Sequence, residues 1–168
     1  MASHLVHMPA HTFFHAGRYQ DAAVVNAQAI GADTGWMKAG GNPTAPNAKP
    51  QALPMYYAHN LAFGLAGALM SGDAQLALKY AEHAELVYRD PVPVGSRAYP
   101  VPRTWVALAR FAPDKALAVP GMTGDPRFHI YRAYSRGEAF LQKGDVAGAR
   151  AEVKALSKVK GAGGAPEL

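Results

Sequence analysis

Three segments of this chain share a glycine, a short polar break, and an alanine five residues after the glycine. The glycines are Gly17, Gly72 and Gly144, and the matching alanines are Ala22, Ala77 and Ala149. Apolar residues with helical spacing stand on both sides of each glycine. Glycine adopts the left-handed backbone that ends a helix, and an aspartate directly after it, as at Asp73 and Asp145, suits the start of the next helix. The pattern therefore predicts helix pairs joined by tight turns.

The composition agrees with an all-α fold that has a real core. The chain has 168 residues, 49% of them hydrophobic, and no segment carries a strong strand pattern. The absence of cysteine excludes disulfides, thiolate metal sites and cysteine nucleophiles. No run of 18 apolar residues is present to span a membrane, and the first residues lack the pattern of a secretory signal. Composition and targeting signals leave the cellular compartment unknown.

The three segments resemble the tetratricopeptide repeat (TPR) family, in bacterial style. The family's unit is a helix pair of about 34 residues, and units stack into a right-handed superhelix. A degenerate fourth copy places Ala112 where the glycine stands, and Trp105 where the family prefers a small residue. The resemblance implies a single TPR-like domain over residues 1–160. The expected helix pairs are 8–16 with 19–32, 55–71 with 73–89, 100–111 with 113–118, and 126–143 with 145–159.

The spacing between copies is irregular. Gly17 and Gly72 are 55 residues apart, which predicts an insertion loop over 33–54 that is rich in Gly, Pro and Asn. A second loop is expected over 90–98, and the tail 161–168 is expected to be disordered. Nothing in the first residues caps the first repeat, so either a preceding part or self-association is expected to cover that end.

Four histidines stand close together near the N-terminus. His4, His7, His11 and His15 fall within an arc of about 80° on a helical wheel. Pro9 interrupts such a helix unless it lies in the first turn. We therefore expect a helix that begins near Met8, with His4 and His7 in an irregular lead-in over the same side.

In TPR arrays the first helix of each pair lines a concave groove, and the resemblance extends this role to this chain's histidines. Counting back 13, 10, 6 and 2 residues from Gly17 gives the same four histidines. Equivalent counts in the other copies add His59, Tyr99, Arg110, Tyr131, Tyr134 and Glu138. Asn60, the residue after His59, is included as a neighbour. The resemblance thus implies an interaction module that binds a peptide or protein segment in a His/Tyr-lined groove.

A metal site is the alternative interpretation of the same histidines. His7 and His11 have the i, i+4 spacing by which one helix face offers two nitrogens to one metal, and His59 supplies a third from the neighbouring helix. Imidazole suits zinc and copper. There is no HExxH motif, and the first 20 residues contain no acid, so the sequence favours a binding protein over a metal-dependent enzyme.

The net charge of +5 does not predict nucleic-acid binding. Basic residues gather only toward the C-terminus, where Asp145 and Glu152 are mixed with them. Nucleic-acid binders usually concentrate basic residues and aromatic residues on one face. The cluster consists of Lys143, Arg150, Lys154, Lys158 and Lys160. We interpret it as the solvated side of a last helix.

Overall fold

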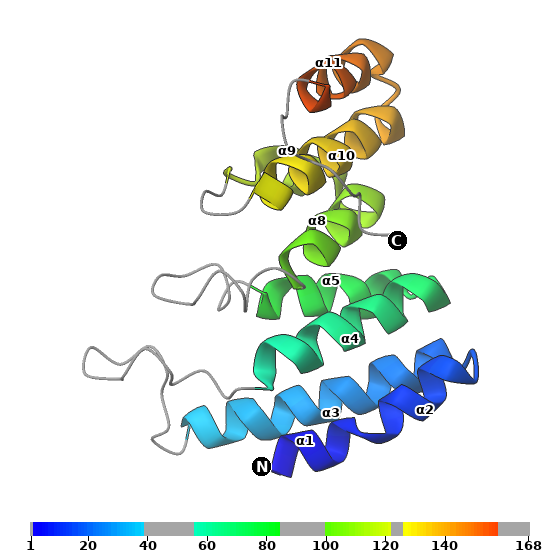
Figure 1. Ribbon diagram of the computed structural model, residues 1–168, viewed down its shortest axis with the longest axis vertical. Helices are drawn as coiled ribbons and strands as arrows, with labels where there is room; N and C mark the ends of the chain where they lie inside the picture. Colours follow the sequence, from blue (N-terminus) through cyan, green and yellow to red (C-terminus); the bar gives the residue numbers. More distant parts are fainter. Residues whose placement is uncertain (1, 39–55, 85–99, 122–125, 158–168) are drawn as a thin grey trace. The chain divides into compact units, whose positions relative to one another are not determined.

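The computed structural model describes residues 2–38, 56–84, 100–121 and 126–157, and these are helices joined by turns, with no strand among them. The all-α prediction is confirmed. The helices are α1 (Ala2–His7), α2 (Pro9–His15), α3 (Tyr19–Lys38), α4 (Tyr57–Ser71), α5 (Ala74–His83), α8 (Pro100–Phe111), α9 (Pro113–Ala118), α10 (Pro126–Gln142) and α11 (Val146–Leu156) (Figure 1). Within the described segments, none of these helices is long and apolar enough to cross a membrane.

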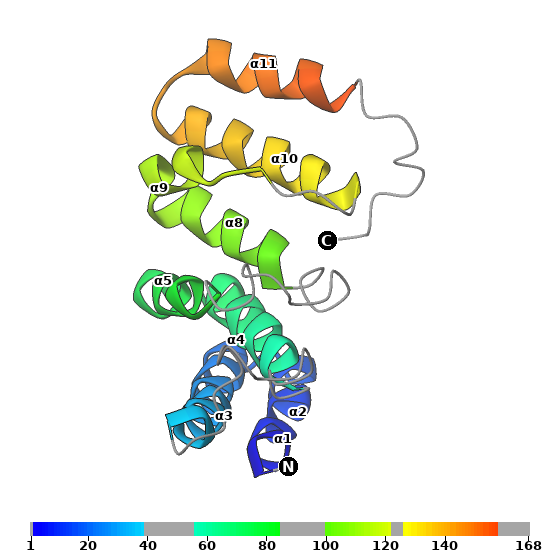
Figure 2. The same ribbon diagram turned by 90° about the vertical axis from the view of Figure 1, so that its left-hand side faces the viewer.

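The chain divides into two compact units, residues 1–104 and 105–168, and the boundary falls inside α8. In the first unit, α3 is the central helix. Helices α1 and α2 pack along one side of α3, α4 packs along another, and α5 packs against α4 (Figures 1 and 2). The prediction of one domain over 1–160 stays a prediction.

Small residues bring α3 and α4 together. A Cβ at Gly67 would lie 2.8 Å from the carbonyl oxygen of Tyr19 and 3.0 Å from the amide nitrogen of Ala23, so only glycine fits there without a shift of backbone. The hydroxyl of Tyr80 on α5 donates to the carbonyl of Ala23 at 2.5 Å. This close packing places the face of α4 that carries Gly67 and Asn60 next to α3.

The three glycine turns were predicted correctly. Gly17, Gly72 and Gly144 have φ of 72°, 75° and 75°, and the described residues contain no other position with positive φ. In each turn the residue after the glycine donates its N–H to the carbonyl five residues earlier, at 2.8, 3.0 and 2.8 Å. This is the Schellman hydrogen bond that closes a helix C-terminus. The side chains of Asp73 and Asp145 then accept from Leu76 N–H and Gly148 N–H, as expected of N-caps.

The degenerate copy uses a different turn. Ala112 has φ −151° and ψ 63°, and Pro113 follows as the first residue of α9. A left-handed conformation costs a residue with a Cβ about 1–2 kcal/mol, so a turn with negative φ at Ala112 and proline at the first helical position is the cheaper solution. The four turns therefore share their position in the pattern but not their geometry.

Two predicted boundaries were wrong. The lead-in expected before Met8 is helical, because α1 covers Ala2–His7. Helix α3 continues to Lys38, so residues 33–38 of the expected insertion loop are helix. Residues 1, 39–55, 85–99, 122–125 and 158–168 lie outside the described residues, and these ranges include the rest of the predicted insertion loop, the predicted 90–98 loop, Tyr99 and the predicted tail.

In the second unit α10 packs against both α9 and α11. Ala109, Ala116 and Ala139 form its small core, with Leu108 and Leu117 against them. Arg136 ties three elements of this unit together: it donates to Glu152 at 2.7 Å and to the carbonyl of Leu117 at 2.7 Å. The matching alanines of the three copies, Ala22, Ala77 and Ala149, are buried.

Candidate metal centre

The backbone keeps His7 and His11 on the same side despite Pro9. Met8 stays in the right-handed helical region, with φ −49° and ψ −40°, and its N–H donates to the carbonyl of His4 at 3.0 Å. Pro9 is then the first residue of α2, where a missing N–H costs little. The two histidines remain about one helical turn apart, with the change from α1 to α2 between them.

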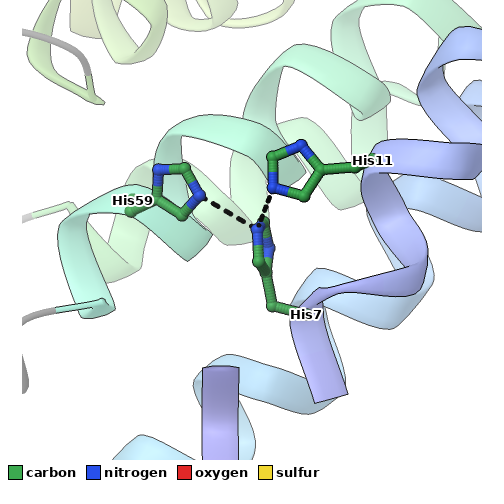
Figure 3. Close-up of side chains that lie close together, drawn as sticks. All are labelled: His7, His11 and His59. Carbon is green, nitrogen blue, oxygen red and sulfur yellow. Dashed lines mark hydrogen bonds between the residues drawn. The ribbon is translucent and has the colours of Figure 1, made fainter. Parts of the chain in front are cut away.

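His59 comes from the first turns of α4 and meets the other two histidines. The Nε2 atoms of His11 and His59 each lie 2.9 Å from His7 Nε2, and one ligand nitrogen from each of the three residues lies within 4.8 Å of the other two. Figure 3 shows the His7 ring between the rings of His11 and His59. Three imidazole nitrogens from α1, α2 and α4 thus converge on one point.

Asn26 of α3 determines which nitrogen of His7 points to that point. Its Oδ1 lies 2.6 Å from His7 Nδ1, and its Nδ2 donates to the carbonyl of Ala22 at 2.7 Å. Because the amide N–H₂ is engaged with Ala22, the oxygen faces His7 and requires a proton on Nδ1. Neutral His7 therefore presents a bare lone pair at Nε2, toward His11 and His59.

Hydrogen bonds alone do not satisfy this arrangement. His7 Nε2 has one lone pair in the ring plane, and two other Nε2 atoms lie at 2.9 Å from it. A single lone pair accepts one N–H well, so a neutral network leaves one of the two close contacts without a good hydrogen bond. A cation that accepts all three lone pairs removes this conflict.

Burial keeps the inner histidines neutral. His7 is 0% exposed, and burial lowers its pKa, as do the charges of His11 and His4, against the raising effect of the Asn26 hydrogen bond. Burial also lowers the pKa of His59 to about 4, with further lowering by His7, His11 and His4. Metals bind neutral imidazole, so these two ligands need lose no proton near pH 7.

Aromatic rings surround the three imidazoles. Phe63 of α4 contacts all three, with ring centroids at 4.5 Å from His11, 5.0 Å from His59 and 5.3 Å from His7. His4 stacks on Tyr56 at 3.8 Å and lies 5.8 Å from His7. These ring contacts restrict the motion of the three imidazoles.

The cluster is close to the geometry of a tetrahedral zinc site. With Zn–N bonds of about 2.0–2.1 Å, the ligand nitrogens of such a site lie about 3.4 Å apart. The two shorter separations, 2.9 Å each, must lengthen, and the third, up to 4.8 Å, must shorten. These changes amount to less than about 1 Å per ring.

The other predicted site residues lie outside this cluster. His15 is exposed at the end of α2, and His4 lies beside the cluster on Tyr56. Asn60 is buried and turns toward α3, where it donates to Asp33 at 3.2 Å. In the second unit, Arg110 pairs with Glu138 at 2.9 Å, Tyr131 is half-buried, and Tyr134 is 39% exposed.

Two residues that support the cluster, Asn26 and Phe63, were not among the predicted site residues. Asn26 had a weak sequence signal, because it is a polar residue inside the apolar stretch Ala22–Ala27. Its contact with His7 depends on how α3 is rotated against α1, which one sequence does not reveal. Phe63 reads as an ordinary core residue.

Comparisons with protein-family models, with curated proteins and with solved structures found no match to this chain.

Proposed function

We propose that this chain is a metal-binding protein that holds a transition-metal dication, zinc or copper, on His7, His11 and His59. The observation that carries the proposal is the convergence of three imidazole nitrogens around a His7 whose Nδ1 is held by Asn26. Metal-ligating histidines usually donate the second ring N–H to a carbonyl, carboxylate or water, which orients the ring. The Asn26 side-chain carbonyl plays that part here.

Zinc is the ion that this geometry favours. Three protein nitrogens and a fourth open position are the ligand set of many zinc sites, and zinc has no geometric preference of its own that the helices must satisfy. Copper(II) binds the same ligand type more tightly in general and prefers a flatter arrangement. Zinc and copper are therefore distinguished by their affinities for the chain, and bound copper(II) also by its visible spectrum.

A bound ion would cross-link three helices. His7 and His11 belong to α1 and α2, His59 belongs to α4, and these helices otherwise share α3 as their packing partner. A ligand that binds only the folded chain stabilises it by about 4 kcal/mol at a concentration one thousand times its dissociation constant. Metal binding should thus raise the melting temperature strongly.

The test uses the chain without a histidine tag. Elemental analysis and titration with zinc and copper should give about one metal per chain, with a raised melting temperature. The double variant His7→Ala/His11→Ala should lose both effects. His15→Ala is the matched control, since it removes an exposed histidine of α2, the helix that carries His11. This variant should bind metal like the unmodified chain. A chain that takes up no metal, or that keeps its metal in the double variant, contradicts the proposal.

We also propose that the helix pairs form a TPR-like superhelix. The support is local: the three glycine turns share the same φ region and the same Schellman bond. The peptide-binding groove expected from this resemblance has less support, because the guanidinium of Arg110 already contacts a carboxylate of its own chain, Glu138. Binding of a peptide or protein partner stays a prediction.

A further inference from the structure

The proposed metal site has an unbalanced charge, and this points to the kind of ligand it takes. The inference rests on the proposed function. Three neutral imidazoles leave the full charge of a dication uncompensated. Burial of an unpaired charge is costly, and here the innermost ligand, His7, is fully buried and Phe63 contacts all three rings. An anion at the fourth position relieves this cost.

The neighbouring sequence offers few carboxylates. Residues 1–72 contain two acidic residues, Asp21 and Asp33. Asp21 pairs with Arg18 at 2.6 Å. Asp33 is buried and accepts from Asn60, which faces α3 and not the histidines. Among the described residues, the group of metal-binding side chains contains the three histidines and no acid. Because no described acidic side chain belongs to the cluster, the geometry points to a bound ligand as the source of the balancing anion.

The donors around the cluster suit a carboxylate. Phosphate presents three acceptor oxygens and is usually held by arginine, lysine or several backbone N–H groups. Arg18 is the arginine of α1–α3 and their turns, and its guanidinium pairs with Asp21 and lies over the Phe13 ring. A carboxylate has two oxygens and needs one further donor once the metal holds the first.

His4 is the available donor. Its ring lies 5.8 Å from the ring of His7, and its Nδ1 is buried without a hydrogen-bond partner among the described residues. Stacking on Tyr56 at 3.8 Å holds the ring in place. A buried nitrogen without a partner costs free energy that a ligand oxygen would recover.

We infer that the metal site binds a carboxylate ligand, with one oxygen on the metal held by His7, His11 and His59 and the second oxygen hydrogen-bonded by His4. The carboxylate belongs either to a small organic acid or to the C-terminus of a peptide. The two sources share this chemistry and differ in what surrounds the carboxylate.

The experiment uses the full chain loaded with cobalt(II), whose visible absorption reports a change of ligand. Cobalt content is measured first, by elemental analysis. Acetate is then titrated at constant ionic strength, with chloride as the control anion. In parallel, an acetylated tri-alanine peptide with a free C-terminus is titrated, with its C-terminal amide as the control. We expect a saturable change of the cobalt spectrum with acetate and with the free-acid peptide, and none with the amide.

His4→Phe is the second arm, because phenylalanine keeps the stacking on Tyr56 and removes the donor. It should leave cobalt uptake unchanged and weaken acetate binding by at least about tenfold, as expected for the loss of a hydrogen bond to a charged group. Equal affinity for acetate and the free-acid peptide identifies a small carboxylate as sufficient, whereas tighter binding of the peptide identifies a C-terminus.

Three distinct outcomes contradict the inference in whole or in part. Cobalt uptake with a spectrum that acetate does not change refutes the carboxylate ligand and leaves the metal site standing. A failure to take up cobalt, zinc or copper refutes both the metal site and the inference that rests on it. An acetate affinity that His4→Phe does not alter refutes the role of His4.

Discussion

Replacement of Asn26 by alanine tests the structural basis of the metal site. The variant removes the acceptor of His7 Nδ1–H, which lies 2.6 Å away, and leaves that N–H in a fully buried position. An unsatisfied buried donor costs about 1–3 kcal/mol, so we expect the metal-free chain to lose that much stability. Loss of the outer partner also frees the His7 ring to turn, and such changes typically weaken metal binding by about 10–100-fold.

Two assays separate these effects. Urea unfolding with a chelator present gives the stability of the metal-free chain, and competition with a chelator of known affinity gives zinc affinity. Tyr80→Phe is the matched control. It removes a buried hydrogen bond to α3, from the Tyr80 hydroxyl to the carbonyl of Ala23, and Tyr80 lies on α5, which carries none of the three imidazoles. It should lower stability by about 1 kcal/mol and leave zinc affinity unchanged. If Asn26→Ala binds zinc like the unmodified chain, the argument that Asn26 orients His7 is refuted.

Three further predictions follow from packing and charge. In the folded chain the pKa of His59 is about 4, against an ordinary value of 6.5, so between these pH values the unfolded chain binds more protons than the folded chain. The free energy of unfolding of the metal-free chain should therefore fall by about 1–2 kcal/mol as the pH drops from 6.5 to 4. Urea unfolding of His59→Phe should show a weaker pH dependence of this free energy. Gly67→Ala forces the backbones of α3 and α4 apart, so it should lower the free energy of unfolding by about 1–3 kcal/mol and weaken zinc binding. Gly31→Ala is its control: the added methyl meets nothing within 4 Å, so this variant should be as stable as the unmodified chain or more stable. Gly72→Ala, at φ 75°, should cost about 1 kcal/mol in a thermal or urea melt without altering zinc affinity; a stability equal to that of the unmodified chain contradicts it.

Local signals in the sequence were sufficient to predict the helix pairs. Gly72 and Asp73 act within one turn, so their effect on the backbone does not depend on distant packing. The boundaries that were wrong depend on packing over a longer range. α1 forms because its residues lie against α3, and Pro9 interrupts it less than expected because Met8 keeps a helical conformation. The propensity of a short N-terminal segment alone does not contain this information.

The meeting of His7, His11 and His59 was predicted by two arguments of different kinds. The spacing of His7 and His11 is a property of one helix. The addition of His59 required a register between two helix pairs, and that register followed from counting back from Gly17 and Gly72. Both pairs close with the same turn geometry, which fixes the phase of each preceding helix relative to its glycine.

The same count placed His7 wrongly with respect to solvent. It was expected on an open groove, yet it is 0% exposed, while His11 and His59 are half-buried. This gradient gives the three ligands unequal roles. His7 is held by Asn26 and by surrounding packing, so its nitrogen defines where an ion binds. The rings of His11 and His59 are less enclosed and share Phe63 as their neighbour, so they can adjust to the bond length of the ion. Discrimination between zinc and copper should therefore depend on Phe63. Its ring limits how far the His11 and His59 rings can move toward the flatter ligand arrangement that copper(II) prefers.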